Sequence, residues 1–123
     1  MSSYVLIVDD DKDMAQTLAD MVSLFDWDTQ IVHGPRSALQ AIYRRPPALI
    51  LLDLNMPGVD GMEVCRYIKR DPIAQGTSVV FVTAEDDPGI MQKAREAGAM
   101  DYLVKPVDID QLEGILNKVR ESL

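Results

Sequence analysis

Residues Ala48–Gly58 read ALILLDLNMPG, which joins the most apolar run of the chain to an aspartate and then to a turn. A short, unbroken apolar run that ends at turn residues is typical of a strand buried on both faces of a parallel sheet. An ionised carboxylate at the end of such a strand is costly to desolvate unless a cation or hydrogen bonds compensate its charge. We therefore expect a compensating group to meet Asp53 at the end of its strand.

Apolar runs of this kind alternate along the chain with segments whose apolar residues recur at helical spacing. This alternation predicts an α/β fold: a single-domain (βα)5 unit over residues 1–123, with a doubly wound parallel five-stranded sheet and helices on both faces. The expected strands are 4–8, 28–32, 48–53, 78–82 and 101–104. The expected helices are 13–25, a segment between Gly34-Pro35 and Pro46-Pro47, one that carries the apolar residues 62–68 and is ended by Asp71-Pro72, 88–97, and one that follows Asp108 and ends at about 122.

Composition limits the classes of protein that fit. The net charge of −8 argues against direct nucleic-acid binding, because a phosphate backbone needs a basic face. The one cysteine, Cys65, excludes an internal disulfide framework and fits a reducing cytoplasm. No apolar run approaches the roughly 20 residues of a membrane span, and Met1-Ser2-Ser3 lacks the charge that starts a signal peptide. We expect a cytoplasmic domain with no membrane contact.

Five polar side chains stand at the ends of four predicted strands. Asp9 and Asp10 follow the first strand, Asp53 ends the third, Thr83 follows the fourth, and Lys105 follows the fifth. Ligands of such sheets bind beyond the carboxyl ends of the strands, so we expect these groups to converge on one edge. Three adjacent carboxylates require a divalent cation, and all-oxygen sites suit Mg²⁺, Mn²⁺ or Ca²⁺. With a lysine and a hydroxyl donor, the set predicts phosphoryl transfer onto an aspartate.

Four motifs follow one another in the chain: VDDD at Val8–Asp11, DLNMPGVDG at Asp53–Gly61, VTA at Val82–Ala84, and Lys105-Pro106. Together they resemble the receiver domain of bacterial response regulators, over essentially the whole chain and at the separations usual for that family. Each motif alone is weak, and four in register are specific. The resemblance implies the flavodoxin-like strand order 2-1-3-4-5. It also implies a signalling switch rather than an enzyme, phosphorylated by a sensor histidine kinase or a histidine phosphotransfer protein.

The resemblance implies how the acceptor and its metal are held. Asp53 would be the phosphoacceptor. Asp10 would bind Mg²⁺ (or Mn²⁺) directly, Asn55 through its backbone carbonyl, and Asp9 mainly through water, with Asp53 as a further metal ligand. Asn55 and Glu85 stand two residues beyond the acceptor and beyond the threonine, where the family tunes self-dephosphorylation.

The resemblance also implies the phosphoryl contacts and the switch. Lys105, the Thr83 hydroxyl and the Ala84 backbone N–H would hold the phosphoryl oxygens. Tyr102 would turn inward when the Thr83 hydroxyl moves, and the Lys105-Pro106 bond would be cis. The face formed by the fourth helix, the fifth strand and the fifth helix would then dock an output protein or domain, or form a homodimer on phosphorylation.

Simpler interpretations exist for the same residues. Asp9–Asp11 could cap the first helix, but a cap needs one acid, and we expect Asp11 to supply it. A calcium loop is excluded because Met14 stands where that loop requires glycine. Thr83 alone would be read as a helix cap, and Tyr102 as a residue that packs at an edge strand.

Two other function classes compete with the switch. One is an Mg²⁺-dependent phosphohydrolase with an aspartyl nucleophile, of the kind that resembles the haloacid dehalogenases. Such enzymes carry a second acid two residues after the nucleophile, where Asn55 stands, and a cap for which this chain has no room. The other is a flavin- or nucleotide-binding module, which needs a glycine-rich turn where Asp9–Asp11 would repel a phosphate.

Overall fold

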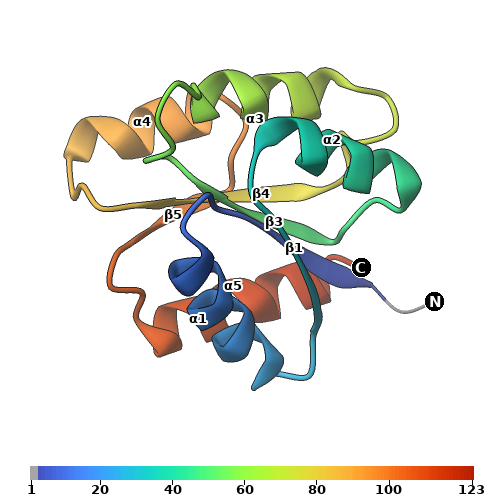
Figure 1. Cartoon of the computed structure of the whole chain (residues 1–123), viewed down its shortest axis with the longest axis vertical. Helices are drawn as coiled ribbons and strands as arrows, with labels where there is room; N and C mark the ends of the chain where they lie inside the picture. The colour runs from blue at the N-terminus through green and yellow to red at the C-terminus, as the bar shows by residue number, and fades with distance from the viewer. Residues whose placement is uncertain (1–2) are drawn as a thin grey trace.

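The computed structural model of the chain describes residues 3–123, so Met1 and Ser2, where a signal peptide would start, lie outside the described residues. Within residues 3–123, five strands alternate with five helices (Figure 1). The strands are β1 (Tyr4–Val8), β2 (Asp28–Val32), β3 (Leu49–Asp53), β4 (Ser78–Thr83) and β5 (Asp101–Val104). The helices are α1 (Lys12–Ser23), α2 (Pro35–Arg44), α3 (Gly61–Arg70), α4 (Pro88–Glu96) and α5 (Ile109–Glu121).

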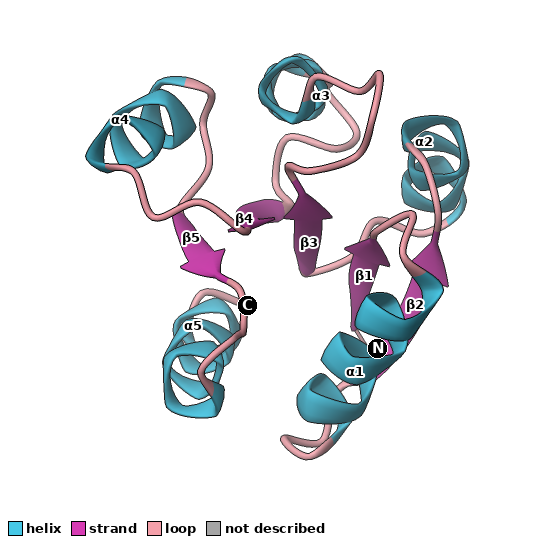
Figure 2. Ribbon diagram, turned by 60° about the vertical axis from the view of Figure 1, so that its left-hand side comes forward, coloured by secondary structure: helices cyan, strands magenta, loops and turns pink. Residues whose placement is uncertain are grey.

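All strands of the sheet run parallel, in the order β2-β1-β3-β4-β5, which confirms the expected doubly wound topology. Helices α2, α3 and α4 cover one face, and α1 and α5 cover the other (Figure 2). Near the carboxyl edge the paired residues are Val8–Leu52, Asp53–Val82 and Thr83–Val104. The strand ends therefore lie side by side along one edge.

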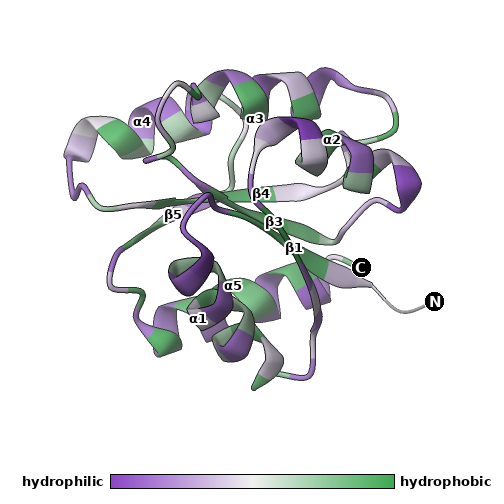
Figure 3. Cartoon of the chain, viewed as in Figure 1, coloured by the Kyte–Doolittle hydropathy of each residue, from purple (hydrophilic) through white to green (hydrophobic). Residues whose placement is uncertain are grey.

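Two apolar layers fill the space between the sheet and its helices. Leu6, Leu52 and Phe81 belong to the layer under α2–α4, whereas Ile7 and Leu51 belong to the layer under α1 and α5. Successive side chains of a strand point to opposite faces, so a strand covered on both sides must be apolar throughout. Both β1 and β3 are buried along their whole length, and most of each strand is coloured as hydrophobic in Figure 3. This confirms the buried strand expected before Asp53.

Helix α1 differs most from its expected bounds. The Asp11 carboxylate caps it as predicted, accepting hydrogen bonds from two backbone N–H groups of the first turn at 3.0 and 3.1 Å. The predicted end at 25 is wrong by two residues. Leu24 is the C-cap, and Asp26 adopts a left-handed φ of 65°. Phe25 extends the apolar period because it packs against the core from the turn after the helix.

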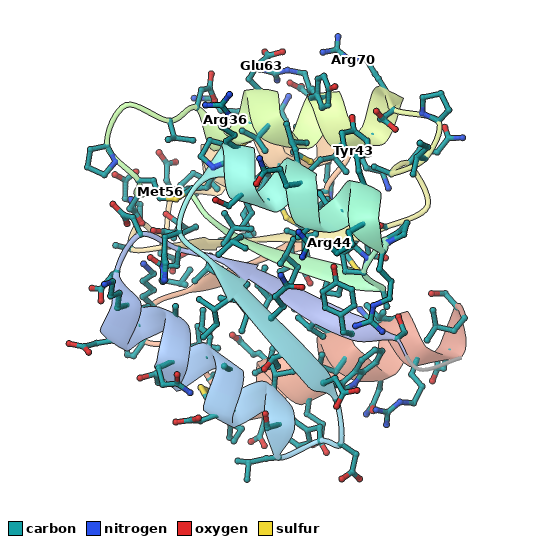
Figure 4. All side chains as sticks on the ribbon, turned by 45° about the vertical axis from the view of Figure 1, so that its right-hand side comes forward. Arg36, Tyr43, Arg44, Met56, Glu63 and Arg70 are labelled. Atoms are coloured by element: carbon teal, nitrogen blue, oxygen red, sulfur yellow. The ribbon has the colours of Figure 1, made fainter. Side chains whose placement is uncertain are left out.

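Outside the sheet, a hydrogen-bonded group joins α2 to the end of α3. The Tyr43 hydroxyl donates to Asp71 Oδ2 at 2.6 Å and lies 3.0 Å from the hydroxyl of Tyr67. This bond to a carboxylate raises the pKa of Tyr43 and lowers the pKa of Asp71. Figure 4 shows Tyr43 on α2, and on α3 the ion-paired Glu63 and Arg70. The group connects the surfaces of the two helices.

Two glycines provide a matched test of the backbone. Gly98 has a φ of +98°, and an added Cβ would lie 2.7 Å from Cγ of Lys69, whose ammonium is held by two backbone carbonyls. Gly114 lies within α5, and an added Cβ would meet none of the described atoms within 4 Å. We expect Gly98→Ala to lower the free energy of unfolding by roughly 1–3 kcal/mol. We expect Gly114→Ala to raise it by about 0.5–1 kcal/mol.

Urea unfolding followed by circular dichroism measures both changes on the same scale. Equal effects of the two substitutions would contradict the backbone conformation given for Gly98.

Candidate functional site

Three carboxylates lie together at the edge where β1 and β3 end. Asp9 and Asp10 directly follow β1, and Asp53 is the last residue of β3. Because Val8 and Leu52 are paired in register, the residues after them start side by side. One oxygen of each carboxylate lies within 4.8 Å of the other two, as the strand pattern predicted. Asp9 and Asp53 are 1% and 3% exposed, whereas Asp10 is open to solvent.

Lys105 supplies a cation to the two buried carboxylates. Its Nζ donates to Asp53 Oδ1 at 3.1 Å and lies 3.8 Å from Asp9 Oδ2. The backbone N–H of Lys105 donates to the Thr83 carbonyl at 2.8 Å, which fixes the lysine to the end of β4. The Lys105-Pro106 peptide bond is cis, as expected.

The carboxylate of Asp9 is only partly stabilised by the groups around it. Its Oδ1 accepts a hydrogen bond from the Asp11 N–H at 3.0 Å, but Oδ2 has no hydrogen-bond partner among residues 3–123. Burial raises the pKa of Asp9 to about 6; the Asp11 N–H opposes this shift, the Asp53 charge adds to it, and Lys105 opposes it. An orphaned carboxylate oxygen beside two further carboxylates is a donor set for a hard divalent cation. The residues present therefore fit Mg²⁺.

The end of β4 and the loop after β3 complete the site. Thr83 is buried, and its Oγ1 accepts a hydrogen bond from the Glu85 N–H at 3.1 Å, which leaves the hydroxyl proton for another acceptor. The Ala84 N–H donates to the side-chain Oδ1 of Asn55 at 2.8 Å. Asn55 is itself attached to Asp53, because its N–H donates to Asp53 Oδ1 at 3.0 Å. Threonine, alanine and asparagine therefore border the carboxylates.

Tyr102 is directed away from this group. Its hydroxyl donates to Asp86 Oδ1 at 3.4 Å. The side chain is half-buried and borders a hollow of about 470 Å³ between β5 and α5, which Gln111 and Gly114 also line. The predicted switch residue thus lies at the surface, beside the face expected to meet a partner.

Two contacts of the site were missed by reasoning from the sequence. His33 follows the edge strand β2, and its Nδ1 lies 3.0 Å from the backbone carbonyl oxygen of Asp9. The available signal was that β2 neighbours β1, so the residues after both strands meet. The bond from Ala84 to the Asn55 side chain had no such signal, because it depends on one rotamer across two loops.

Comparison with known proteins accounts for this arrangement. The family model described as response regulator receiver domain matches residues 5–117. The chain belongs to this family. The resemblance noted in the sequence motifs is thereby confirmed.

Relatives of this receiver domain include longer regulators. It is 36% identical over 106 residues to the DNA-binding response regulator MtrA of Mycobacterium tuberculosis, covering 86% of this chain and 45% of MtrA. It is 37% identical over 108 residues to the response regulator PleD of Caulobacter vibrioides, covering 88% of this chain and 24% of PleD. The chain therefore spans less than half the length of these relatives.

A solved structure shows the same fold on a chain of similar size. The chemotaxis protein CheY4 of Vibrio cholerae matches with a TM-score of 0.87 at 25% identity, covering 97% of this chain and 99% of CheY4.

Membership of the family establishes the coarse function. Receiver domains of two-component response regulators are phosphorylation-controlled switches, and histidine kinases phosphorylate them. The alternative of a phosphohydrolase finds no support in these relatives. Receiver domains generally bind Mg²⁺ through an acidic cluster, and Asp9, Asp10 and Asp53 form such a cluster here. Among residues 3–123, no helix is long and apolar enough to cross a membrane.

The raised pKa of Asp9 predicts a pH-dependent stability of this receiver domain in EDTA. The folded state holds the Asp9 proton up to about pH 6, whereas an aspartate of the unfolded chain loses it near 3.9. The free energy of unfolding should therefore fall as pH rises from about 4 to 6, by on the order of 1–3 kcal/mol from this group. Asp9→Asn should remove this contribution, and added Mg²⁺ should restore stability to the parent at pH 7.

Urea unfolding across pH 4–7, with and without Mg²⁺, measures the effect. Asp28→Asn, on the exposed edge of β2, is the matched control and should keep the parental slope. Identical slopes for Asp9→Asn and the parent would contradict the prediction.

Proposed function

We propose that Asp53 is the phosphoacceptor of this receiver domain, and that it takes the phosphoryl group from a histidine kinase or a histidine phosphotransfer protein. The observation that carries the proposal is the position of the Lys105 ammonium, 3.1 Å from Asp53 Oδ1, beside Asp9 and Asp10. A neighbouring cation favours the ionised, nucleophilic form of a carboxylate. A carboxylate oxygen of Asp53 forms the new bond to phosphorus while the phosphorus–nitrogen bond of phosphohistidine breaks.

The metal would be held by the residues that the family resemblance indicated. Asp10 and Asp53 would bind Mg²⁺ directly, Asp9 mainly through water, and Asn55 through its backbone carbonyl, with Mn²⁺ as a substitute. When bound, the ion neutralises charge on the phosphoryl oxygens. The orphaned Oδ2 of Asp9 supports this assignment.

Three donors of the chain would hold the phosphoryl oxygens. The Lys105 ammonium already donates to Asp53 Oδ1. The Thr83 hydroxyl proton is free to donate, and the Ala84 N–H belongs to the loop that follows β4. Preorganised donors of this kind stabilise the charge of the transferring group without reorganisation at the moment of reaction. The small side chain of Ala84 leaves room for the phosphodonor. Glu85, like Asn55, would tune the rate at which the acyl phosphate is lost.

The output would pass through the face formed by α4, β5 and α5. Movement of the Thr83 hydroxyl toward the phosphoryl group would allow Tyr102 to turn inward, away from Asp86. The hollow beside Tyr102 would then change shape, and an output protein or domain, or a second receiver, would bind there. We propose that residues 1–123 act as one such unit, in the cytoplasm, where response regulators generally work.

Phosphorylation by a small donor tests the acceptor. We expect acetyl phosphate and Mg²⁺ to give a single acid-stable, base-labile phosphoryl adduct, seen by intact-mass spectrometry. Asp53→Asn and the parent in EDTA should give none, because the nucleophile or the compensating charge is missing. Asp28→Asn should react like the parent. An adduct that persists in Asp53→Asn, or catalytic release of phosphate from unrelated monoesters, would refute the assignment.

The position of Tyr102 tests the switch. We expect the aromatic NMR signals of Tyr102 to shift on phosphorylation, because its ring leaves the surface. Tyr43 and Tyr67, on α2 and α3, serve as internal controls and should not shift. At an equal level of phosphorylation, Thr83→Ala should reduce the Tyr102 shift by at least half. An equal shift in the parent and in Thr83→Ala would show that the threonine does not control the tyrosine.

A further inference from the structure

One phosphoryl-binding donor is already occupied in the resting protein. The Ala84 N–H donates to Asn55 Oδ1 at 2.8 Å, a good geometry for such a bond. We propose that the Asn55 carboxamide is a resting-state substitute for a phosphoryl oxygen, and that it must leave Ala84 each time Asp53 is phosphorylated. This inference rests on the proposed role of Asp53. It assigns to the Asn55 side chain a function in the unphosphorylated state.

The backbone around both residues holds this hydrogen bond in place. The Asn55 N–H donates to Asp53 Oδ1 at 3.0 Å, and the neighbouring Leu54 N–H donates to the Val82 carbonyl at 2.9 Å. Asp53 and Val82 are paired in the sheet, so the loops that follow β3 and β4 leave the same edge together. The Asn55 carboxamide therefore faces Ala84 from a fixed origin, although its side chain is exposed.

The other two donors do not need to exchange a partner. The Lys105 ammonium donates to Asp53 Oδ1 and has three N–H donors, so it can bind a phosphoryl oxygen without giving up Asp53. Thr83 uses its oxygen as an acceptor for the Glu85 N–H and keeps its proton. Of the three phosphoryl-binding donors, only the Ala84 N–H has its one hydrogen already bonded to a side chain. The Asn55–Ala84 hydrogen bond is consequently the contact that phosphorylation must break.

The exchange is favourable but not free. A phosphoryl oxygen is charged, and hydrogen bonds to charged acceptors are roughly twice as strong as neutral ones. The phosphoryl group therefore displaces the neutral hydrogen bond between the Ala84 N–H and the Asn55 carboxamide. That hydrogen bond must open before the phosphoryl oxygen can bind. Opening a neutral hydrogen bond of ordinary net strength slows the step by about 3- to 10-fold. The Asn55 carboxamide thus acts as a brake on phosphorylation and holds the β4–α4 loop in its resting position.

That loop also carries Asp86, which accepts the hydrogen bond from the Tyr102 hydroxyl. Ala84 and Asp86 are two residues apart, so release of Ala84 from Asn55 would act on the segment that carries the acceptor of the Tyr102 hydroxyl. Opening of the Asn55–Ala84 hydrogen bond therefore connects the acceptor to the switch.

Amide hydrogen exchange tests the contact without any phosphorylation. In the resting, metal-free protein followed by NMR, we expect Asn55→Ala to speed exchange of the Ala84 amide at least 5-fold. The Glu85 amide, held by Thr83, should be unchanged, and Asn55→Asp, which keeps an acceptor oxygen, should keep Ala84 protected. Equal exchange of the Ala84 amide in the parent and in Asn55→Ala would overturn the proposal.

Phosphorylation kinetics then test the brake. With acetyl phosphate at saturating Mg²⁺, we expect Asn55→Ala to react about 3- to 10-fold faster than the parent. Asn117→Ala, the same substitution at an exposed position of α5, should react at the parental rate. A parental or slower rate in Asn55→Ala, with the Ala84 amide protected in the parent, would overturn the brake. If no variant is phosphorylated, the acceptor assignment fails, and the exchange data still decide the contact.

Discussion

The site depends on the ion pair between Lys105 Nζ and Asp53 Oδ1, which are 3.1 Å apart. Asp9 Oδ2 lies 3.8 Å from the same ammonium. Two nearly buried carboxylates and one exposed carboxylate share this single lysine. When all three are ionised, two negative charges remain uncompensated, which is the charge that one divalent cation carries. Without such an ion, burial, with the neighbouring Asp53 charge adding to it, raises the pKa of Asp9, the buried carboxyl group with the orphaned oxygen, to about 6.

The sheet makes this concentration of charge tolerable. Strands β1 and β3 are buried along their whole length and are apolar up to Asp53 at the end of β3, so packing on both faces of the sheet fixes their positions. A slip of one residue in either strand would turn its side chains to the opposite faces, and the register is therefore strongly specified. The energy that holds Asp9 beside Asp53 comes from the apolar layers, not from the site itself. The site can consequently contain unfavourable contacts that a loop would not sustain.

The strand positions are fixed by the apolar layers, whereas contacts within the site depend on individual side chains. This difference explains which features could be predicted from the sequence. Asp53 and Lys105 were placed together because strand ends align whenever the sheet is parallel, and the apolar runs fix where the strands end. The cap at Asp11 was also local and predictable. The end of α1 was not, because Phe25 continues the helical period while packing from a turn. The contact of Asn55 with Ala84 was missed because it depends on one side-chain rotamer across two loops. The contact of His33 with Asp9 could have been inferred, because β2 and β1 are neighbours and the residues after them meet.

The chemistry of residue 55 follows from the charge of the site. A carboxylate there would add a fourth acid to a group that already lacks two positive charges, and it would bind the Ala84 N–H through a charge-assisted bond that a phosphoryl oxygen could not readily displace. An apolar side chain would leave the N–H to water. A carboxamide avoids both, since it is neutral, accepts from Ala84 at 2.8 Å, and yields to a stronger acceptor. In the resting site the Ala84 N–H therefore has a hydrogen-bond partner, whereas Asp9 Oδ2 has none among residues 3–123. The phosphoryl group would change the partner of Ala84, and the metal would supply one near Asp9.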